Sequence, residues 1–441
     1  MRKSIYLLAV LICLCLHLAA QNPPAGLTAK VKQQVVDTLA KALKENYVFL
    51  DTAIKMGNYI EKRLKDGAYA TINNPNDFAQ ALTGDVHSVY NDMHLSINFD
   101  PGFKMAAQDT SAADAKKREQ DNMKFEAQQN YAFKKVEILS GNIGYLRFDG
   151  FFTPGIYAKE TVNSAFAFLK NVNALIIDLR YNGGGDPDMV NYICSHLLKG
   201  RTHINDLYER RINKTYESWT DTLDSTASLY TMPVYVLTSR RTFSGAEEFS
   251  YDLQNLHRAT IVGETTGGGA HPVSSEDISN GFVGNIPYAR AINPVTHTNW
   301  EAVGVKPDVP IAADSAQNEA MLTYFNYKIN NAVDSNEAKA FKWKWDMMNA
   351  TMHPAQVDTA ILKTYAGNFS GDRHVVFKNG ALYYSRGSNP AQKLIAMSQT
   401  VFRPEEFDFV KVEFIANDSH QVNDISFLYD NGSTQEAKRN L

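Results

Sequence analysis

The chain has 441 residues, of which 44% are hydrophobic, so it can form one large domain with accessory parts or two to three domains, and a disordered protein is excluded. Its 44 lysines and arginines stand against 48 acidic residues. The net charge of −4 offers no basic surface for nucleic acid, so nucleic-acid binding is set aside.

The first twenty residues have the pattern of a secretory signal peptide. Arg2 and Lys3 form a positively charged start, an apolar run from Ile5 to Leu16 follows, and Ala19-Ala20 precedes the expected cleavage point. The apolar run is too short to favour an uncleaved anchor helix. We therefore expect residues 1–20 to be removed, leaving an exported protein, periplasmic or extracellular, with no membrane span.

The cysteines predict a fold without disulfides. Cys13 and Cys15 lie within the signal, so cleavage would leave Cys194 alone. Cys194 falls in the helical pattern MVNYICSHLL, and we interpret it as a small packed residue rather than a nucleophile.

A helical subdomain is predicted over residues 21–100, because apolar residues recur at three- and four-residue spacing in VKQQVVDTLAKALKENYVFL and FAQALTGDVHSVY. Residues 101–135 then lose their apolar side chains and fill with Ala, Lys, Gln and Asp. This composition predicts a solvated connector or a mobile flap, too short for an inserted globular domain.

Strands and helices alternate over residues 136–315. The segments NIGYLRF, ALIIDLR, PVYVLTS and ATIVGE have the composition of buried strands, and AKETVNSAFAFLKN and MVNYICSHLL are two of the helical segments between them. This order predicts an α/β fold with a largely parallel sheet covered on both faces. Chemistry in such sheets gathers at the carboxyl ends of the strands.

The remaining chain changes character twice. Residues 316–354 are predicted to be helical, and residues 355–441 to form a small all-β domain, because short alternating strands such as VVFKNGALYYS are separated by Asn-Gly turns. We expect an antiparallel barrel or sandwich there.

Ser244 lies where the strand PVYVLTS passes into a helix, within TSRRTFSGAEEF. Ser244 and Glu247 are spaced as a capping box, in which the hydroxyl accepts a helix N–H and the glutamate reaches back. The local pattern by itself favours this capping role over a catalytic one. Only features elsewhere in the chain can favour catalysis.

Two glycine-rich loops follow other strands. In DLRYNGGG, Asp178 and Arg180 are expected to pair and hold the turn, while the glycines free the backbone to present N–H groups. The second loop is GETTGGGAHP. Neither has the spacing of a phosphate-binding loop, so no nucleotide is expected.

Five segments together, DMHL, DLRYNGGG, TSRRTFSGAEEF, VGETTGGGAHP and NWEAVGVKPD, resemble the tail-specific (carboxy-terminal processing) serine peptidase family. The resemblance is to its branch containing the tricorn core and interphotoreceptor retinoid-binding protein, and it covers roughly Leu27 to Ile311. It implies a crotonase-like core sheet with flanking helices, and a peptidase that needs no metal or cofactor. The terminal β-domain lies outside it.

The resemblance assigns roles to residues far apart in the sequence. It implies that Ser244 is the nucleophile, that His94 is the base, and that Glu301 stabilises the imidazolium. The amides of Gly245 and of Gly184, or of its neighbour Gly183, would bind the oxyanion.

Alternatives remain for the base and for its orienting acid. His271, beside the second glycine loop, competes with His94, and Asp92 is a substitute orienter. The other branch of the family uses a lysine at the position held here by Gly269. No lysine occurs from Ala259 to Glu301, so a Ser/Lys mechanism is excluded.

The chain departs from the family in two places. Met93 precedes the histidine where the tricorn pattern has a serine, so a link from His94 to Glu301 would be direct or through water. The segment from Pro101 to Val136 is too short for the peptide-binding PDZ module of relatives that process protein tails. Selectivity must then come from the cleft, with the flap as a candidate lid.

The function expected from these features is that of a secreted or periplasmic serine peptidase that cleaves peptides or proteins through an acyl-enzyme on Ser244. Its activity should fall as pH drops through a pKa near ~6.5, the value of an ordinary histidine base. The alternatives are a catalytically silent protein of the same fold that binds an apolar ligand or peptide, and a small-molecule esterase or amidase. The oligomeric state is left open.

Overall fold

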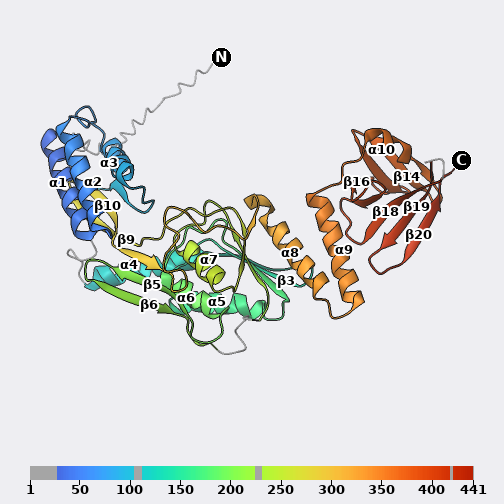
Figure 1. The fold of residues 1–441 in the computed structure, drawn as a ribbon, viewed down its shortest axis with the longest axis horizontal. Helices are drawn as coiled ribbons and strands as arrows, with labels where there is room; N and C mark the ends of the chain where they lie inside the picture. Colours follow the sequence, from blue (N-terminus) through green and yellow to red (C-terminus); the bar gives the residue numbers. More distant parts are fainter. Residues whose placement is uncertain (1–26, 104–111, 224–230, 418–420, 441) are drawn as a thin grey trace, which may run out of the picture. The chain divides into compact units, whose positions relative to one another are not determined.

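The computed structural model describes residues 27–103, 112–223, 231–417 and 421–440, and Figure 1 labels its elements. The predicted signal, with Cys13 and Cys15, lies outside the described residues. The described residues divide into two compact units. One comprises 27–91, 95–103 and 274–286, and the other comprises the remaining described residues.

The first unit is a small helical bundle with a three-stranded sheet. Its elements are α1 (Ala29–Asn46), α2 (Leu50–Lys65), α3 (Pro75–Val89), β1 (Ser96–Phe99), β9 (Val273–Ser279) and β10 (Phe282–Pro287). The strand order is β1-β10-β9. On α1, Val35, Leu39 and Leu43 are fully buried at helical spacing, as predicted for the helical subdomain. Gly57 on α2 lets the helices approach closely, since a Cβ there would lie 3.3 Å from that of Ala40.

A six-stranded sheet forms the centre of the second unit. Its strands are β2 (Phe133–Leu139), β3 (Ile143–Phe148), β4 (Ala174–Asp178), β7 (Val234–Thr238), β8 (Thr260–Gly263) and β12 (Val309–Pro310). The order is β12-β8-β7-β4-β3-β2, and every neighbouring pair is parallel except β2 with β3. The predicted α/β fold with a largely parallel sheet is confirmed.

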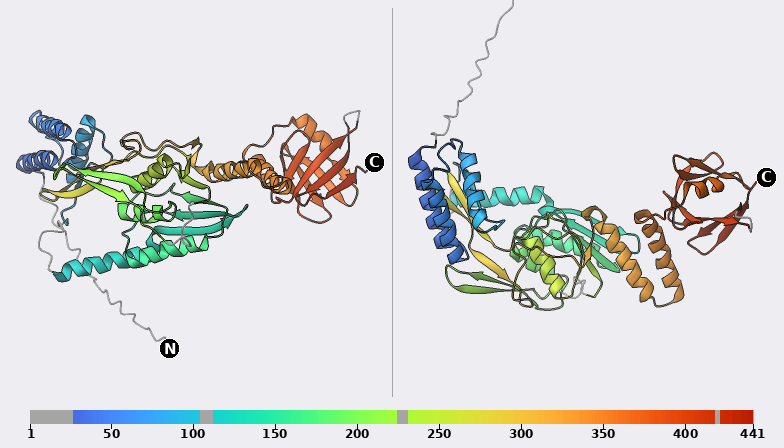
Figure 2. Two further views of the ribbon diagram at one scale, coloured as in Figure 1. Left: turned by 60° about the horizontal axis from the view of Figure 1, so that its bottom comes forward. Right: turned by 45° about the horizontal axis from the view of Figure 1, so that its top comes forward.

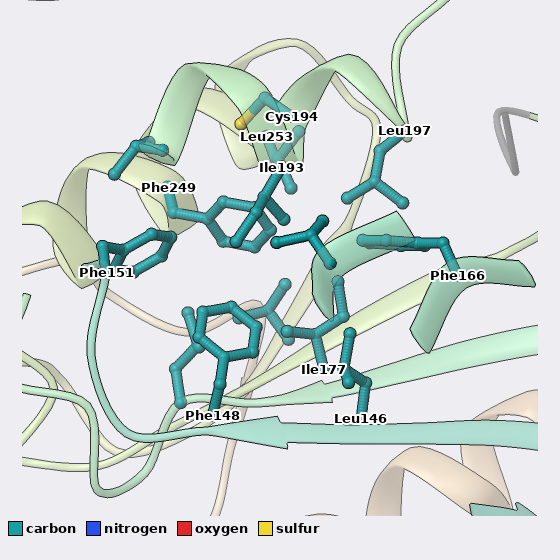
Figure 3. Packing of buried hydrophobic residues seen from close by; sticks show 14 of the residues in the cluster. Leu146, Phe148, Phe151, Phe166, Ile177, Ile193, Cys194, Leu197, Phe249 and Leu253 are labelled. Atoms are coloured by element: carbon teal, nitrogen blue, oxygen red, sulfur yellow. The ribbon is translucent and has the colours of Figure 1, made fainter. Parts of the chain in front are cut away.

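Helices cover both faces of this sheet, because alternate residues of each strand point to opposite sides. Leu175 and Ile177 of β4 pack with α5 (Ile156–Phe168), α6 (Pro187–Ser195) and α7 (Gly245–Asn255) in the core shown in Figure 3. Ala174 and Ile176 pack with α8 (Ala316–Asn330) and α9 (Ser335–Met352) on the other side. Cys194 is fully buried in the first of these cores, which confirms its packing role.

Two features of this unit were not predicted. A second sheet, of order β11-β5-β6, is formed by β5 (His203–Glu209), β6 (Lys214–Trp219) and β11 (Ala289–Ile292). The expected connector over residues 101–135 contains the helix α4 (Ala112–Gln128) and the short η1 (Asn130–Ala132). The described side chains of α4 are almost all exposed, as the composition predicted, but Ala, Lys, Glu and Gln are strong helix formers and the segment is therefore not a loop.

The C-terminal domain is an eight-stranded antiparallel barrel. It consists of α10 (Thr359–Tyr365), β13 (Gly367–Phe369), β14 (Arg373–Lys378), β15 (Ala381–Arg386), β16 (Gln392–Ala396), β17 (Val401–Pro404), β18 (Val410–Ala416), β19 (Val422–Tyr429) and β20 (Thr434–Lys438). Each strand pairs with the next, and a bridge from Phe369 to Arg439 joins the first strand to the last. The right-hand view of Figure 2 shows the red strands curving around the domain. None of the helices in the described residues is both long enough and apolar enough to cross a membrane.

Candidate active site

Ser244 lies at the turn between β7 and α7, near the carboxyl end of a central parallel strand. Its backbone has φ 53° and ψ −124°. Residues other than glycine rarely adopt this combination, which costs about 1–3 kcal/mol. Strain of this kind at a strand-to-helix turn exposes the side chain of the serine above the sheet. The surrounding turn must hold it in place.

The loop DLRYNGGG packs directly against this turn. Gly184 has φ +96°, and a Cβ there would lie 2.7 Å from both the Cβ of Ser244 and the amide nitrogen of Gly245. Only glycine permits this approach. The predicted pairing of Asp178 with Arg180 is confirmed as a two-pronged ion pair at 2.9 and 2.7 Å, and it anchors the start of the loop.

Glu247 organises the turn beyond the capping role that the sequence suggested. One carboxylate oxygen accepts the amide of Ser244 at 2.9 Å and that of Gly269 at 2.8 Å. The other accepts the amide of Gly268 at 2.6 Å and the hydroxyl of Thr266 at 2.5 Å. The side chain of Glu247 therefore accepts the amide of Ser244, as the predicted capping box requires. The amide of Glu247 itself donates to the carbonyl oxygen of Ser244 at 2.8 Å. The pKa of the Glu247 carboxyl is raised by its burial, against the lowering effect of these bonds.

The segments VGETTGGGAHP and NWEAVGVKPD are joined along their length. The indole of Trp300 donates to the carbonyl of Gly269 at 2.7 Å, and the carboxylate of Glu301 accepts the amide of Ala270 at 2.7 Å. The amide of Val305 donates to the hydroxyl of Thr266 at 2.6 Å. Two motifs about thirty residues apart in sequence thus form one rigid wall beside Ser244.

The imidazole of His94 lies over Gly269. A Cβ on Gly269 would lie 2.5 Å from Cε1 of His94 and 2.3 Å from the ring of Phe243. The Phe243 ring packs against the imidazole at an interplanar angle of 30°, with ring centres 4.6 Å apart. The histidine therefore occupies the space in which the other branch of the family is expected to hold a lysine. Burial lowers the pKa of His94 below its ordinary value, although the charge of Asp92 opposes this. Its Nδ1 atom is buried and has no hydrogen-bond partner among the described residues.

Glu301 lies close to this histidine. Its Oε1 atom is also buried, with no partner in the part of the chain that the structure describes, and burial raises the pKa of its carboxyl to about 7. Asp92, His94 and Glu301 each offer one potential ligand atom within 4.8 Å of the others. These residue types suit a divalent cation, but both Asp92 oxygens already accept hydrogen bonds, from the His94 amide at 3.1 Å and from His271 at 2.7 Å.

His271, the competing base, is held on the far side of this cluster. Its Nδ1 atom contacts Asp92 at 2.7 Å and Glu301 at 3.5 Å, and its side chain is 1% exposed. Asp92 therefore orients the ring of His271 and the backbone of His94, rather than the ring of His94. Met93, which replaces the serine of the tricorn pattern, is 52% exposed.

The predicted oxyanion donors differ in their present hydrogen bonds. The N–H of Gly184 donates to the side chain of Asn182 at 2.8 Å, so in this structure it is not directed to a substrate oxygen. Gly183 does not line the cavity that contains Ser244. Gly185 and Gly245 do line it, and neither amide donates a hydrogen bond among the described residues. The sequence gives no signal that separates three consecutive glycines.

Ser244 and His94 open onto one cavity of about 710 Å³, called the Ser244 cavity below. The strand-to-helix turn, the glycine loops and the second sheet line it, and neither His271 nor Asp92 does. The cavity is large enough for several side chains of a peptide.

Comparisons with known proteins match most of the chain to one peptidase family. Residues 142–311 match the model of peptidase family S41, and residues 27–140 match the N-terminal domain of this family in eukaryotic IRBP. Carboxyl-terminal-processing peptidase 2, a chloroplastic protein of Arabidopsis thaliana, is 32% identical over 184 residues, which are 41% of this chain and 34% of that protein. The chain thus matches about a third of the length of that relative.

Solved structures of peptidases are also similar. A putative peptidase from Parabacteroides merdae is 21% identical, with a TM-score of 0.49, over 69% of this chain and 99% of that one. A putative protease of the same family from Bacteroides fragilis is 22% identical, with a TM-score of 0.37, over 42% of this chain and 51% of that one. The two family models match adjacent segments, residues 27–140 and residues 142–311. The chain therefore belongs to peptidase family S41.

Proposed function

We propose that this protein is an exported serine peptidase that hydrolyses peptide bonds through an acyl-enzyme on Ser244, with His94 as base and Glu301 as its partner. The observation that carries the proposal is the strained Ser244 turn, which opens with His94 and two unengaged amides onto one cavity. Membership of a peptidase family supports the reaction class. The signal pattern in the sequence supports export.

The proposed chemistry assigns each of these groups the role that it has in a serine hydrolase. His94 takes the proton of the Ser244 hydroxyl as its oxygen attacks the substrate carbonyl, and the amides of Gly185 and Gly245 stabilise the negative oxygen. His94 then returns the proton to the leaving amine. A water activated in the same way releases the acyl group from Ser244.

Glu301 would act on the opposite side of the imidazole. The unpaired Nδ1 of His94 and the unpaired Oε1 of Glu301 are both buried, so each benefits from a link to the other. One ring nitrogen of His94 and one carboxylate oxygen of Glu301 lie within 4.8 Å of each other, a separation that a single water can bridge. An ionised Glu301 then stabilises the imidazolium formed during attack.

Two alternative functions use the same cavity. A silent binding protein would have no need for a strained serine beside a buried histidine, because such strain is retained mainly where function requires it. A small-molecule esterase or amidase would use the same machinery, and it differs from a peptidase only in the substrate that it accepts.

A fluorophosphonate probe should label the protein at a single serine. The amides and the base that activate Ser244 toward carbonyls activate it equally toward this phosphorus centre. Mass spectrometry of the labelled protein should place the adduct on Ser244, and Ser244→Ala should abolish it. An adduct elsewhere, or no labelling of the folded wild-type chain, would remove the proposed function.

The pH profile of kcat/KM should fall in two steps from about pH 8 to about pH 5. The first step lies near pH 7, because protonation of Glu301 removes the charge that stabilises the imidazolium. The second lies on the acidic side of the ordinary histidine value, because burial keeps His94 neutral to lower pH. Glu301→Gln should eliminate only the first step, and a flat profile in the wild type would contradict both assignments.

A further inference from the structure

The Ser244 cavity continues from the serine to a buried carboxylate. Glu248 lies one helical turn beyond Ser244 on α7 and lines the same cavity, although only 8% of the residue is exposed. Its Oε1 atom accepts a hydrogen bond from the side chain of Asn205 at 2.9 Å. Among the described residues, its other carboxylate oxygen accepts none.

Two residues that line the cavity each have a further acceptor oxygen. The Oδ1 atoms of Asn205 and Asn191 are buried, and neither has a hydrogen-bond donor within residues 27–103, 112–223, 231–417 and 421–440. Asn205 is 3% exposed, and the direction of its amide is fixed because its nitrogen must face the carboxylate of Glu248. A buried acceptor without a partner destabilises the protein by the free energy of its lost hydration. A bound group with several hydrogen-bond donors would offset this cost.

The charges around these acceptors have one predominant sign. Asp188 and Asp221 line the cavity beside Glu248, and the charge of Asp188 helps to raise the pKa of the Glu248 carboxyl to about 7, after the larger effect of burial. Arg201 is the cation in the lining, but it is exposed and stacks over the ring of Trp219 at 4.9 Å. A buried carboxylate with this surrounding favours a cationic guest over a neutral one.

We propose that Glu248, with Asn191 and Asn205, makes the enzyme select a lysine or arginine at the residue whose carbonyl Ser244 attacks. This inference rests on the proposed peptidase function. The side chain of that residue stays attached to the acyl group, so it remains in the cavity that Ser244, Gly245 and Glu248 line together. Leu207 and Tyr216 also line the cavity. They would pack the methylene stem of such a side chain while its charged end lies beside Glu248.

The test uses peptides that differ only at this residue, carrying lysine, arginine or the neutral isostere norleucine. For the wild type we expect kcat/KM to be roughly 10- to 100-fold higher with the basic residues, as charge-assisted hydrogen bonds predict. Glu248→Gln should reduce this ratio to about threefold or less. Glu119→Gln, which removes an exposed carboxylate of α4, should keep the wild-type ratio.

Several outcomes would overturn the inference while leaving the peptidase function intact. These are a wild-type ratio near one, a ratio unchanged by Glu248→Gln, or cleavage that mass spectrometry places before the basic residue rather than after it. Failure of the function itself would appear differently, as no turnover of any peptide and no probe on Ser244.

Peptide binding tests the selection of a cationic side chain without any turnover. In Ser244→Ala, a peptide that ends in lysine should bind at least about tenfold more tightly by calorimetry than the same peptide ending in norleucine. The added Glu248→Gln change should equalise the two. Equal binding in Ser244→Ala would refute the selection of a cation.

Discussion

Replacing His94 with alanine should lower kcat/KM for a peptide substrate by roughly 10³- to 10⁵-fold, because the serine loses the group that takes its proton. No described residue pairs with its ring nitrogen Nδ1, and its ring packs against Phe243 and Gly269, so the change removes no hydrogen bond of that nitrogen. The fold should survive the change, so the melting temperature should stay close to that of the wild type. The pH profile of the residual kcat/KM should also lack the decrease at low pH that protonation of His94 causes in the wild type.

The competing base provides the contrast for this experiment. His271 is buried against Asp92 and does not line the Ser244 cavity, so His271→Asn should mainly reduce stability. His353→Ala, at an exposed histidine after α9, is the matched control. Full activity in His94→Ala, together with a catalytic loss in folded His271→Asn, would assign the base to His271.

The part of the site that could be predicted from the sequence lies at the carboxyl ends of the parallel strands. Continuous apolar runs predicted β4, β7 and β8, and the carboxyl ends of parallel strands meet at one edge, so the motifs that follow them had to converge. This is why Ser244 and the loop of Gly184 could be expected to lie together. The family register then added His94 and Glu301, which no local pattern links to Ser244.

Other features depend on directions that the sequence does not encode. The sequence does not distinguish three consecutive glycines. Only the fold shows that the amide of Gly184 donates to Asn182, while the amide of Gly185 donates to none of the described residues. Asp92 could have oriented either histidine, and its side chain turns to His271. The sheet of β5, β6 and β11 escaped prediction because β6, for example, has mostly exposed residues and lacks the buried face that makes a strand recognisable.

Glu247 accounts for the spacing of the two motifs around it. Its side chain ties the Ser244 turn to the loop from Thr266 to Gly269, and His94 packs on the last residue of that loop. The glutamate that looks like a helix cap in the sequence therefore sets the distance between the nucleophile and the wall that carries the base. Removing it should affect stability and catalysis together.

Glu247→Gln should destabilise the protein by about 2–4 kcal/mol and lower kcat/KM by about 100-fold or more. The amide of glutamine has the same shape, but its NH₂ group must face one of the two pairs of donors that the carboxylate now accepts. At least one buried backbone N–H then loses its acceptor, and the turn that holds Ser244 relaxes. Denaturant unfolding and peptide kinetics measure the two effects.

A surface carboxylate in the same region separates this effect from a general loss of charge. Glu264 accepts one longer hydrogen bond, from the amide of Arg240 at 3.3 Å, so Glu264→Gln should change stability by no more than about 0.5 kcal/mol. If Glu247→Gln were equally mild in both measurements, the carboxylate would be an ordinary helix cap. The position of the Ser244 turn would then depend on the packing of Gly184 and Phe243 instead, since these residues touch it from the other sides.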